Sequence, residues 1–232
     1  MIITGKNSVL ESLRAGKTFN KIQIAKGSFG NNEILNLARD KGIKLEFVDR
    51  TILDKKFKNN QGVIADITDF EYSQTEDIIE NSQIVVVLDG IEDPHNLGAI
   101  IRSCECAGVG GIFIPKHRAV AVNDTVIKTS AGAVNNVKVA VVTNLNQLID
   151  TLKENGFWVY GCETGGQNLY QTKLTAKTAL VIGSEGKGIS KLTLSKCDEI
   201  VTIPLLGKIN SLNASVACSI VLYEYVRQNQ TN

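Results

Sequence analysis

The sequence predicts an α/β protein with a small N-terminal α/β domain and a larger C-terminal domain built on a parallel sheet. Three observations lead to this prediction. From residue 82 onward, short apolar runs alternate with segments whose apolar residues recur at helical spacing. The run from Ile84 to Leu88 is wholly aliphatic, as expected of a parallel strand covered on both faces. A polar, acidic stretch separates this region from a basic N-terminal segment.

The N-terminal segment has the pattern of a small sheet with a helix between its strands. Residues 33–39 carry a helical apolar face behind Asn31 or Asn32 as the N-cap. Alternating apolar residues predict the strands, which are 21–24, 44–48 and 63–67.

The net charge of +1 hides an uneven distribution of charged residues along the chain. Residues 1–60 hold 12 Lys and Arg against 6 Asp and Glu, whereas residues 61–80 hold 6 Asp and Glu and no Lys or Arg. This asymmetry indicates that the N-terminal module binds a polyanion. A charged surface that only contacts solvent is an equal alternative. Residues 69–81 read as a polar linker with at most a short helical turn. We therefore expect domains at 1–70 and 82–232 with a linker at 71–81.

The C-terminal segment continues the alternation after its first strand. Helical spacing predicts helices around 97–108 and 145–152, and the remaining strands are expected at 112–114, 137–142, 157–161, 179–182 and 200–203. A βαβ pattern implies a parallel sheet with helices on both faces. Ligands of such sheets bind at the carboxyl ends of the strands.

The last predicted helix has an unusual composition. From Ser211 to Leu222 there is no charged residue, and small residues mix with branched aliphatic ones. A helix without a charged face is buried all round. Burial within one domain would satisfy this pattern, but we favour packing against a second subunit, because a helix at the end of the chain is well placed for a partner.

Composition excludes several classes of protein. The longest aliphatic run is five residues, too short to span a bilayer, and no secretory signal is visible, so we expect a cytoplasmic protein. Five scattered Cys without a CxxC pair indicate free, buried thiols, and two His without HExxH spacing give no metal site. Neither a P-loop nor a GxGxxG fingerprint is present.

Three segments, each at the carboxyl end of an expected strand, together carry a specific signal. They are LDGIEDPHNLGAIIRS at 88–103, LVIGSEGKGI at 180–189 and IPLLGKINSLNAS at 203–215. In them the chain closely resembles the SpoU (TrmH-like) family of S-adenosylmethionine-dependent RNA 2'-O-ribose methyltransferases, within the SPOUT superfamily. The N-terminal GKNSVLESL and NNQGVIA segments resemble the RNA substrate-binding domain of its 23S ribosomal RNA guanosine members.

This resemblance implies a fold and an assembly that periodicity alone would not predict. It implies a SPOUT domain with a deep trefoil knot, which general rules of chain topology make rare. It also implies a homodimer, formed through the C-terminal domain, whose S-adenosylmethionine pocket lies in the knot near the subunit interface. The expected partner is RNA, most specifically 23S ribosomal RNA.

The resemblance also assigns roles to individual residues. The resemblance implies that Arg102 activates the 2'-hydroxyl. Because a guanidinium stays protonated and makes a poor general base, we expect Arg102 instead to hold the ribose and its adjacent phosphate. His95 has a side chain with a suitable pKa, but the family does not depend on that position. The other expected catalytic residues are Asn96, Glu185, Ser211 and Asn213. The expected cofactor-binding residues are Gly183, Ile203, Leu212, Gly186, Leu205 and Ser215.

Three alternatives remain open on the sequence. The same chemistry could act on transfer RNA, although the full N-terminal module favours ribosomal RNA. Methylation of an rRNA adenosine, as in the resistance-type relatives, would use the same motifs. A non-catalytic RNA-binding protein on the same fold is the third, and the intact set of expected catalytic residues argues against it.

Overall fold

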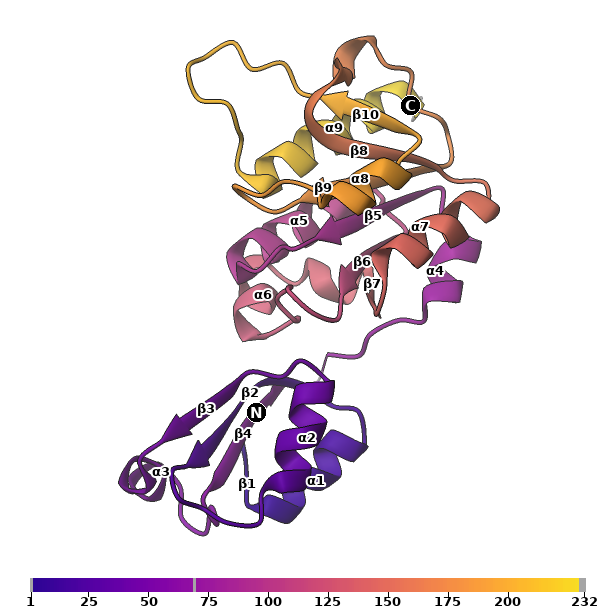
Figure 1. The fold of residues 1–232 in the computed structure, drawn as a ribbon. Coiled ribbons are helices and arrows are strands. Elements are labelled where there is room, and N and C mark those ends of the chain that lie inside the picture. Colours follow the sequence, from indigo (N-terminus) through magenta and orange to yellow (C-terminus); the bar gives the residue numbers. More distant parts are fainter. Residues whose placement is uncertain (1, 69, 230–232) are drawn as a thin grey trace. The chain divides into compact units, whose positions relative to one another are not determined.

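The computed structural model describes residues 2–68 and 70–229 (Figure 1). The chain divides into two compact units, one of Met1–Glu71 with Ala121–Asp124, the other of Tyr72–Val120 with Thr125–Asn232. Both units mix helices and strands, which confirms the predicted fold class.

The N-terminal unit is a four-stranded sheet of order β1-β4-β2-β3, in which β4 runs antiparallel to both of its neighbours. Its core forms where α1 and α2 place Val9, Leu13 and Ile34 against the sheet. The three predicted strands are present, whereas β1, α1 and α3 were not foreseen. The elements are β1 (Ile2–Thr4), α1 (Lys6–Arg14), β2 (Thr18–Ala25), α2 (Asn32–Asp40), β3 (Leu45–Val48), α3 (Arg50–Lys56) and β4 (Val63–Thr68).

The segment expected to be a linker contains part of the C-terminal unit. Helix α4 (Thr75–Asn81) buries Ile78 and Ile79 in the same core as strand residues Val85 and Val87. The compact C-terminal unit starts at Tyr72, so it includes residues 72–81 of the expected linker. Two apolar residues among polar ones are enough to anchor a short helix once a sheet covers them.

The C-terminal unit contains a six-stranded sheet of order β10-β8-β9-β5-β6-β7 in which all pairings are parallel. This confirms the predicted parallel sheet. The central pair, β5 and β9, aligns Asp89 with Gly183 at their carboxyl ends. The strands are β5 (Ile84–Asp89), β6 (Gly111–Pro115), β7 (Lys138–Val142), β8 (Trp158–Asn168), β9 (Thr178–Gly183) and β10 (Glu199–Thr202).

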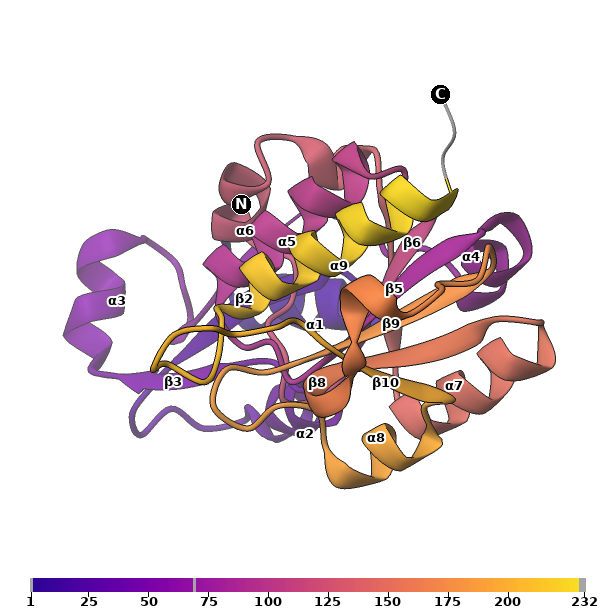
Figure 2. The same cartoon turned by 90° about the horizontal axis from the view of Figure 1, so that it is seen from above.

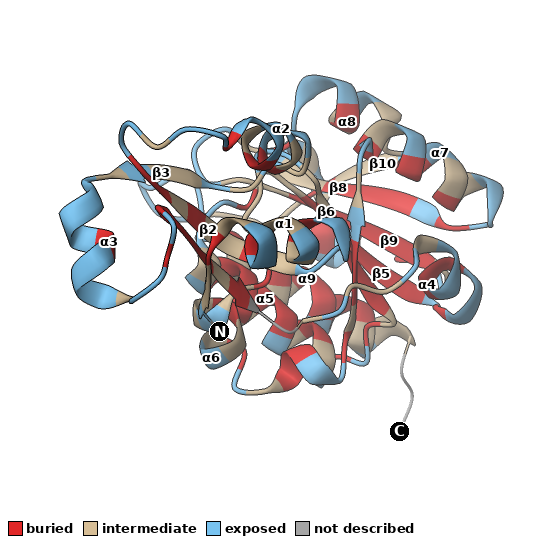
Figure 3. Ribbon diagram, turned by 90° about the horizontal axis from the view of Figure 1, so that it is seen from below, coloured by how far each residue is buried: buried red, intermediate tan, exposed pale blue. Residues whose placement is uncertain are grey.

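Helices cover both faces of this sheet (Figure 2). Helices α4, α7 and α8 pack on the face that presents Val85 and Val87. On the other face α5 and α9 lie side by side, and the Ser103 and Ser219 hydroxyls are 2.7 Å apart between them. The resulting core runs along the strands as a continuous buried layer (Figure 3). The helices are α5 (Pro94–Cys106), α6 (Asp124–Thr129), α7 (Leu145–Glu154), α8 (Lys191–Lys196) and α9 (Ala214–Asn229).

Helix α9 differs from its prediction in two ways. It begins at Ala214, so Ser211 lies in the preceding loop rather than in the helix. It is also not buried all round, since Val216 is 47% exposed and Tyr223 is 50% exposed. These two residues are seven positions apart and so share one face. Within a single chain the helix therefore leaves an apolar stripe uncovered.

The described residues contain neither a membrane-spanning helix nor a metal-binding cluster, and the cysteines are unpaired. Within the described ranges, no helix has the length and hydropathy needed to cross a bilayer. No cluster of three or more His, Cys, Asp or Glu side chains suited to a metal occurs among those same residues. All five Cys are free thiols; Cys104 and Cys218 are buried as expected, whereas Cys106 is exposed.

Candidate active site

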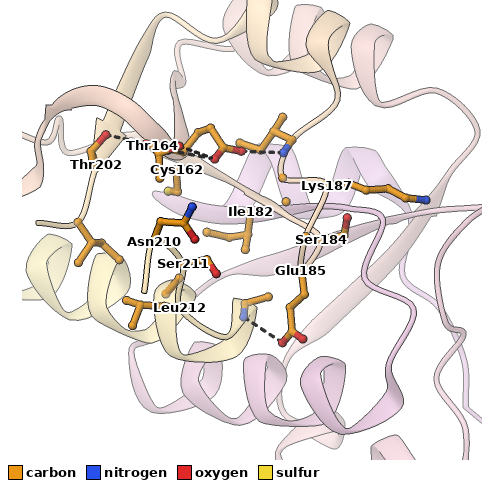
Figure 4. Close-up of a pocket in the computed structure, with 18 of the residues that line it drawn as sticks. Cys162, Thr164, Ile182, Ser184, Glu185, Lys187, Thr202, Asn210, Ser211 and Leu212 are labelled. Carbon is orange, nitrogen blue, oxygen red and sulfur yellow. Dashed lines mark hydrogen bonds between the residues drawn. The ribbon is translucent and has the colours of Figure 1, made fainter. Parts of the chain in front are cut away.

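A pocket of about 490 Å³ opens at the carboxyl ends of β9 and β10 beside the middle of β8, at the edge of the sheet where the strand order predicts a ligand site. Its walls come from four segments: the middle of β8, the glycine loop after β9, the loop after β10 and the start of α9. Figure 4 shows Ile182, Ser211 and Leu212 around this space, with Lys187 extending away from it. Most of these wall residues come from two of the three segments that carry the family resemblance, 180–189 and 203–215.

The glycine loop, residues 183–188, is closed on itself. Ser184 and Gly188 exchange two backbone hydrogen bonds, of 2.9 and 3.2 Å. A methyl group at Gly183 would overlap the backbone of Gly188, so the loop requires glycine there. Gly188 has φ +65°, and a side chain on it would overlap the Glu163 carboxylate. Both glycines are therefore needed to let the loop close over the strand ends.

Glu163 braces this loop and was not predicted from the sequence. Its Oε2 accepts a 3.0 Å hydrogen bond from the backbone N–H of Ile189, just beyond the loop. Its backbone carbonyl accepts a hydrogen bond of 2.6 Å from the Thr202 hydroxyl at the end of β10. Glu163 thus ties together the ends of β8 and β10 and the glycine loop. The sequence signal that could have found it is a carboxylate just after the expected strand 157–161.

Three expected catalytic residues form a closed hydrogen-bonded triangle. The Asn96 amide donates to Glu185 Oε1 at 2.9 Å, and the Asn213 amide donates to Asn96 Oδ1 at 2.9 Å. The Asn213 amide also donates to the same Glu185 oxygen. Asn96 comes from α5, Glu185 from the glycine loop and Asn213 from the start of α9. The triangle therefore joins all three motif segments at one point.

Asn96 and Asn213 both lie near helix starts, where the ordinary role of an asparagine is to cap the helix. The structure assigns the cap of α5 to Asp93, whose Oδ1 accepts from the His95 N–H, so Asn96 is free for the triangle. Asn213 both caps α9 and takes part in the triangle. Its Oδ1 accepts from the backbone N–H groups of Ser215 and Val216, at 2.9 and 3.3 Å, while its amide faces Glu185. Capping and site assembly thus depend on one side chain.

Most of the expected cofactor residues lie in the pocket wall. One does not: Ser215 is absent from the described lining, and its hydroxyl donates to Asn213 Oδ1 at 2.6 Å. Ser211, expected to be catalytic, also lines the pocket. The expected cofactor residues in the lining are Gly183, Gly186, Ile203, Leu205 and Leu212.

Arg102 is also absent from the described pocket lining, and unlike Asn96 and Asn213 it has no hydrogen bond to a residue of the pocket wall. It is exposed on α5 and has no hydrogen bond or ion pair within the part of the chain that the structure describes. Six residues separate it from Asn96, which places it about 9 Å along the helix and turned by about 120°. Arg102 and Asn96 therefore point from different faces of the same helix.

A second pocket, of about 440 Å³, adjoins the first. The two share Ser184, Glu185, Lys187 and Gly188 as a common wall. The second pocket is also lined by Asn96 and by charged side chains that include Asp89, Glu92, Arg118 and Lys187. His95 lies outside the described lining of both pockets, and its ring Nδ1 is 3.4 Å from the Thr129 hydroxyl.

One titratable group in the first pocket has a perturbed acidity. Burial raises the pKa of the Cys162 thiol well above its ordinary value, with smaller contributions from Cys218, Cys197 and Glu163. Cys162 is therefore a neutral thiol at physiological pH and a weak nucleophile.

Comparison with known proteins identifies the family. Residues 83–223 match the SpoU rRNA methylase family, and residues 2–73 match the RNA 2'-O ribose methyltransferase substrate-binding family. A protein of Staphylococcus haemolyticus assigned to the TrmH family of tRNA/rRNA methyltransferases is 42% identical over 238 residues. That alignment covers 98% of this chain and 96% of the relative.

Solved structures agree with this assignment. The SpoU methyltransferase AviRb of Streptomyces viridochromogenes, determined with S-adenosylmethionine, superposes with a TM-score of 0.65 at 22% identity, covering 98% of this chain and 90% of AviRb. The TrmH/SpoU tRNA-modifying enzyme of A. aeolicus has a TM-score of 0.58 at 28% identity, covering 66% of this chain and 80% of that enzyme. The chain belongs to the SpoU/TrmH family of S-adenosylmethionine-dependent RNA methyltransferases.

Proposed function

We propose that this protein transfers the methyl group of S-adenosylmethionine to the ribose 2'-hydroxyl of a guanosine in 23S ribosomal RNA. The observation that carries the proposal is the Asn96–Glu185–Asn213 triangle, which lies where the two pockets meet. A methyl transferase needs two neighbouring sites, one for the donor and one for the acceptor. The shared wall of the two pockets supplies this arrangement.

The first pocket fits the donor in size and chemistry. Its volume of about 490 Å³ lies in the range of sites for small molecules. Ile182, Ile203 and Leu212 offer aliphatic contacts for an adenine ring, and closely packed glycines leave backbone groups accessible. When bound, S-adenosylmethionine supplies an electrophilic methyl group on a sulfonium. The carboxylates of Glu163 and Glu185 line this pocket and favour a cationic ligand electrostatically.

The second pocket is the proposed site of the target nucleoside. Glu185 lines both pockets, and its Oε1 is fixed by Asn96 and Asn213. A fixed carboxylate can accept a hydrogen bond from a ribose hydroxyl and so orient the hydroxyl oxygen toward the donor. The neutral thiol of Cys162 does not compete for the methyl group, because only a thiolate is a strong nucleophile.

Arg102 is proposed to reach the active site from a second copy of the chain. Its exposed position on α5, away from the pocket of its own chain, supports this role. Helix α9, which packs beside α5, carries the uncovered residues Val216 and Tyr223. We propose that this face forms a homodimer that brings the guanidinium to the ribose and its phosphate. The trefoil knot of the family remains a prediction for this chain.

The N-terminal unit supports ribosomal RNA as the substrate over transfer RNA. Its match to a substrate-binding family spans nearly the whole unit, and its basic residues favour a folded polyanion. Such a substrate would place the protein in the cytoplasm. Transfer RNA and an rRNA adenosine are the competing acceptors, and the names of the relatives include both RNA types.

The test is a transfer assay with purified protein and methyl-labelled donor. Unmodified 23S ribosomal RNA and unmodified transfer RNA are offered separately, and the labelled nucleotide is then mapped. Label on the 2'-oxygen of one guanosine in 23S RNA is the expected result. Label on transfer RNA, on adenosine or on a base would contradict the proposed acceptor. Absence of transfer to either RNA would favour a binding protein on the same fold.

A further inference from the structure

Three loop segments meet at one edge of the N-terminal sheet. Strands β1, β2 and β3 are mutually parallel and end at this edge, and β4 starts from it. The segments that follow or precede these strand ends are 5–6, 26–31 and 49–62, and we call them together the loop edge. Figure 1 shows α3 and the neighbouring loops of this unit at that end of the sheet.

Hydrogen bonds between the segments fix the loop edge. The backbone N–H of Lys6 donates to Gln61 Oε1 at 3.1 Å, and the Lys6 ammonium donates to the carbonyl of Phe29. The Asn31 amide holds the same loop through the hydroxyl and carbonyl of Ser28. The loop edge is thus an organised surface rather than a set of separate turns.

The turn at residues 58–61, which precedes β4, has a backbone conformation that is fixed by one buried side chain. Asn59 and Gln61 have φ of 59° and 51°, which side chains rarely adopt. Between them Asn60 is 2% exposed and donates to Asp54 Oδ1 and to the carbonyl of Phe57, both at 2.8 Å. The buried Asn60 therefore anchors the turn, while the neighbouring Lys58 stays exposed.

The loop edge carries an excess of positive charge. Its acidic residues, Asp49 and Asp54, are already paired with Lys26 and Arg50, at 3.3 and 3.6 Å. Three further cations are exposed and have no carboxylate partner among the residues that the structure describes. They are Lys55, Lys56 and Lys58, and their ammonium groups are available to an anionic ligand.

The same edge exposes an aromatic ring. Phe29 is 88% exposed, between Gly27 and Gly30, which both have positive φ. The bond from Lys6 to its carbonyl holds the backbone of this loop. A phenyl ring that is left in water forgoes the burial that such side chains usually obtain. Its natural partner is a flat, partly apolar ligand.

We propose that the loop edge binds an unpaired nucleotide of the RNA substrate, with the base stacked on Phe29 and the neighbouring phosphates held by Lys55, Lys56 and Lys58. The inference rests on the proposed function in one respect, that the ligand is RNA. An exposed aromatic ring and unpaired cations on one edge of a domain are the combination found in sites for single-stranded nucleic acid. A paired duplex hides its bases and offers Phe29 only a terminal pair.

The test measures binding of the full-length protein to a fluorescein-labelled single-stranded RNA of about 12 nucleotides, and to its duplex, over a range of salt concentrations. Phe29→Ala should weaken binding of the single strand roughly 5- to 150-fold without changing the salt dependence. Phe29→Trp should restore it. The triple variant Lys55→Ala, Lys56→Ala, Lys58→Ala should instead reduce the slope of log K against log salt by about two.

Two control variants isolate the loop edge. Tyr170→Ala removes an exposed aromatic ring from the other unit, 56% exposed against 88% for Phe29. Arg39→Ala removes an exposed cation from the last turn of α2, which runs from the loop edge to the opposite end of the sheet. Both variants should bind as the wild type does.

The outcomes separate this inference from the proposed function. Binding that depends on Phe29, in a protein that transfers no methyl group to any RNA, would support the inference and contradict the function. A wild-type enzyme that methylates 23S RNA, together with a Phe29→Ala variant of unchanged affinity and KM, would overturn the inference alone. Equal affinity for the single strand and the duplex, or binding of neither, would also overturn it.

Discussion

Asn96 and Asn213 lie 117 residues apart in the chain, yet a hydrogen bond of 2.9 Å joins their side-chain amides. Both also donate to one oxygen of Glu185, so three distant segments share a single acceptor. Hydrogen bonds to a charged group are stronger than those between neutral groups. The position of the last helix is therefore coupled directly to the loop after β9.

Replacing Glu185 by Gln should lower kcat/KM about 10- to 100-fold. The substitution keeps the shape of the side chain but removes the charge that both asparagines bind, and such bonds contribute about 1.5–3 kcal/mol each when charged. The rate of label transfer to RNA measures the effect. Glu154→Gln, at an exposed site on the end of α7, is the matched control and should leave the rate unchanged. An unaltered rate in Glu185→Gln would contradict the role of the triangle.

Arg102→Lys should keep the charge yet lose most activity, by about 100-fold, because an ammonium cannot reproduce the bidentate geometry of a guanidinium. Arg39→Lys serves as the control for a general effect of Arg-to-Lys substitution. Full retention of activity in Arg102→Lys would show that the guanidinium is not needed.

A mixing experiment tests whether Arg102 acts across the proposed dimer. Arg102→Ala and Glu185→Ala are each inactive in this scheme, but their mixed dimer would contain one intact site. Random exchange of subunits should then restore about a quarter of wild-type activity. Restoration requires the arginine to come from the partner subunit; a mixture that stays inactive after verified exchange would place Arg102 in the site of its own chain.

Gly188→Ala should destabilise the protein and abolish donor binding. A methyl group at this position would overlap the Glu163 carboxylate, and φ +65° adds backbone strain of about 1–2 kcal/mol. Thermal unfolding and calorimetric titration with S-adenosylmethionine measure the two effects. Gly165→Ala is the control, since φ is +85° but nothing lies within 4 Å, so it carries the strain without the clash. Equal behaviour of the two variants would contradict the bracing role of Glu163.

The stability of the N-terminal unit should depend on pH through Glu46. Hydrogen bonds from Lys44 and Lys21 lower the pKa of Glu46 from 4.5 to about 2. A lowered pKa stabilises the folded state above about pH 4.5, and this stabilisation is lost as the pH falls toward 2. Solvent exposure limits it to about 0.5–1 kcal/mol.

Urea unfolding of Glu46→Gln measures this contribution. The variant should be less stable than the wild type at pH 7, and the difference should disappear near pH 2. Glu11→Gln, on the exposed face of α1, provides a comparison without ion pairs among the described residues. If the free energy of unfolding of Glu46→Gln differed from that of the wild type by the same amount at every pH, the proposed pairing of Glu46 with Lys44 and Lys21 would be ruled out.

Hydrophobic patterning predicted all six strands of the C-terminal sheet and the edge at which the site lies. It missed α4 because two buried residues, Ile78 and Ile79, are too few to give a helical period. An uncharged helix face gives no information on whether its partner lies in the same chain, and the single chain leaves Val216 and Tyr223 of α9 exposed.

The site residues depended on motif resemblance rather than on patterning. Asn96 and Asn213 both stand near helix starts, where a cap is the ordinary role, and only the folded chain shows that Asp93 caps α5. Glu163 escaped notice because β8 continues past its predicted end to Asn168. The register of β8 with β10 shifts in this stretch, which no local pattern reveals.

The wall shared by the two pockets has a thermodynamic consequence. Ser184, Glu185, Lys187 and Gly188 line both the proposed donor pocket and the proposed acceptor pocket, so ordering of this loop by either ligand should lower the entropic cost of binding the second. Linkage requires the effect to be reciprocal: RNA should tighten the binding of S-adenosylmethionine by the same factor as the donor tightens RNA.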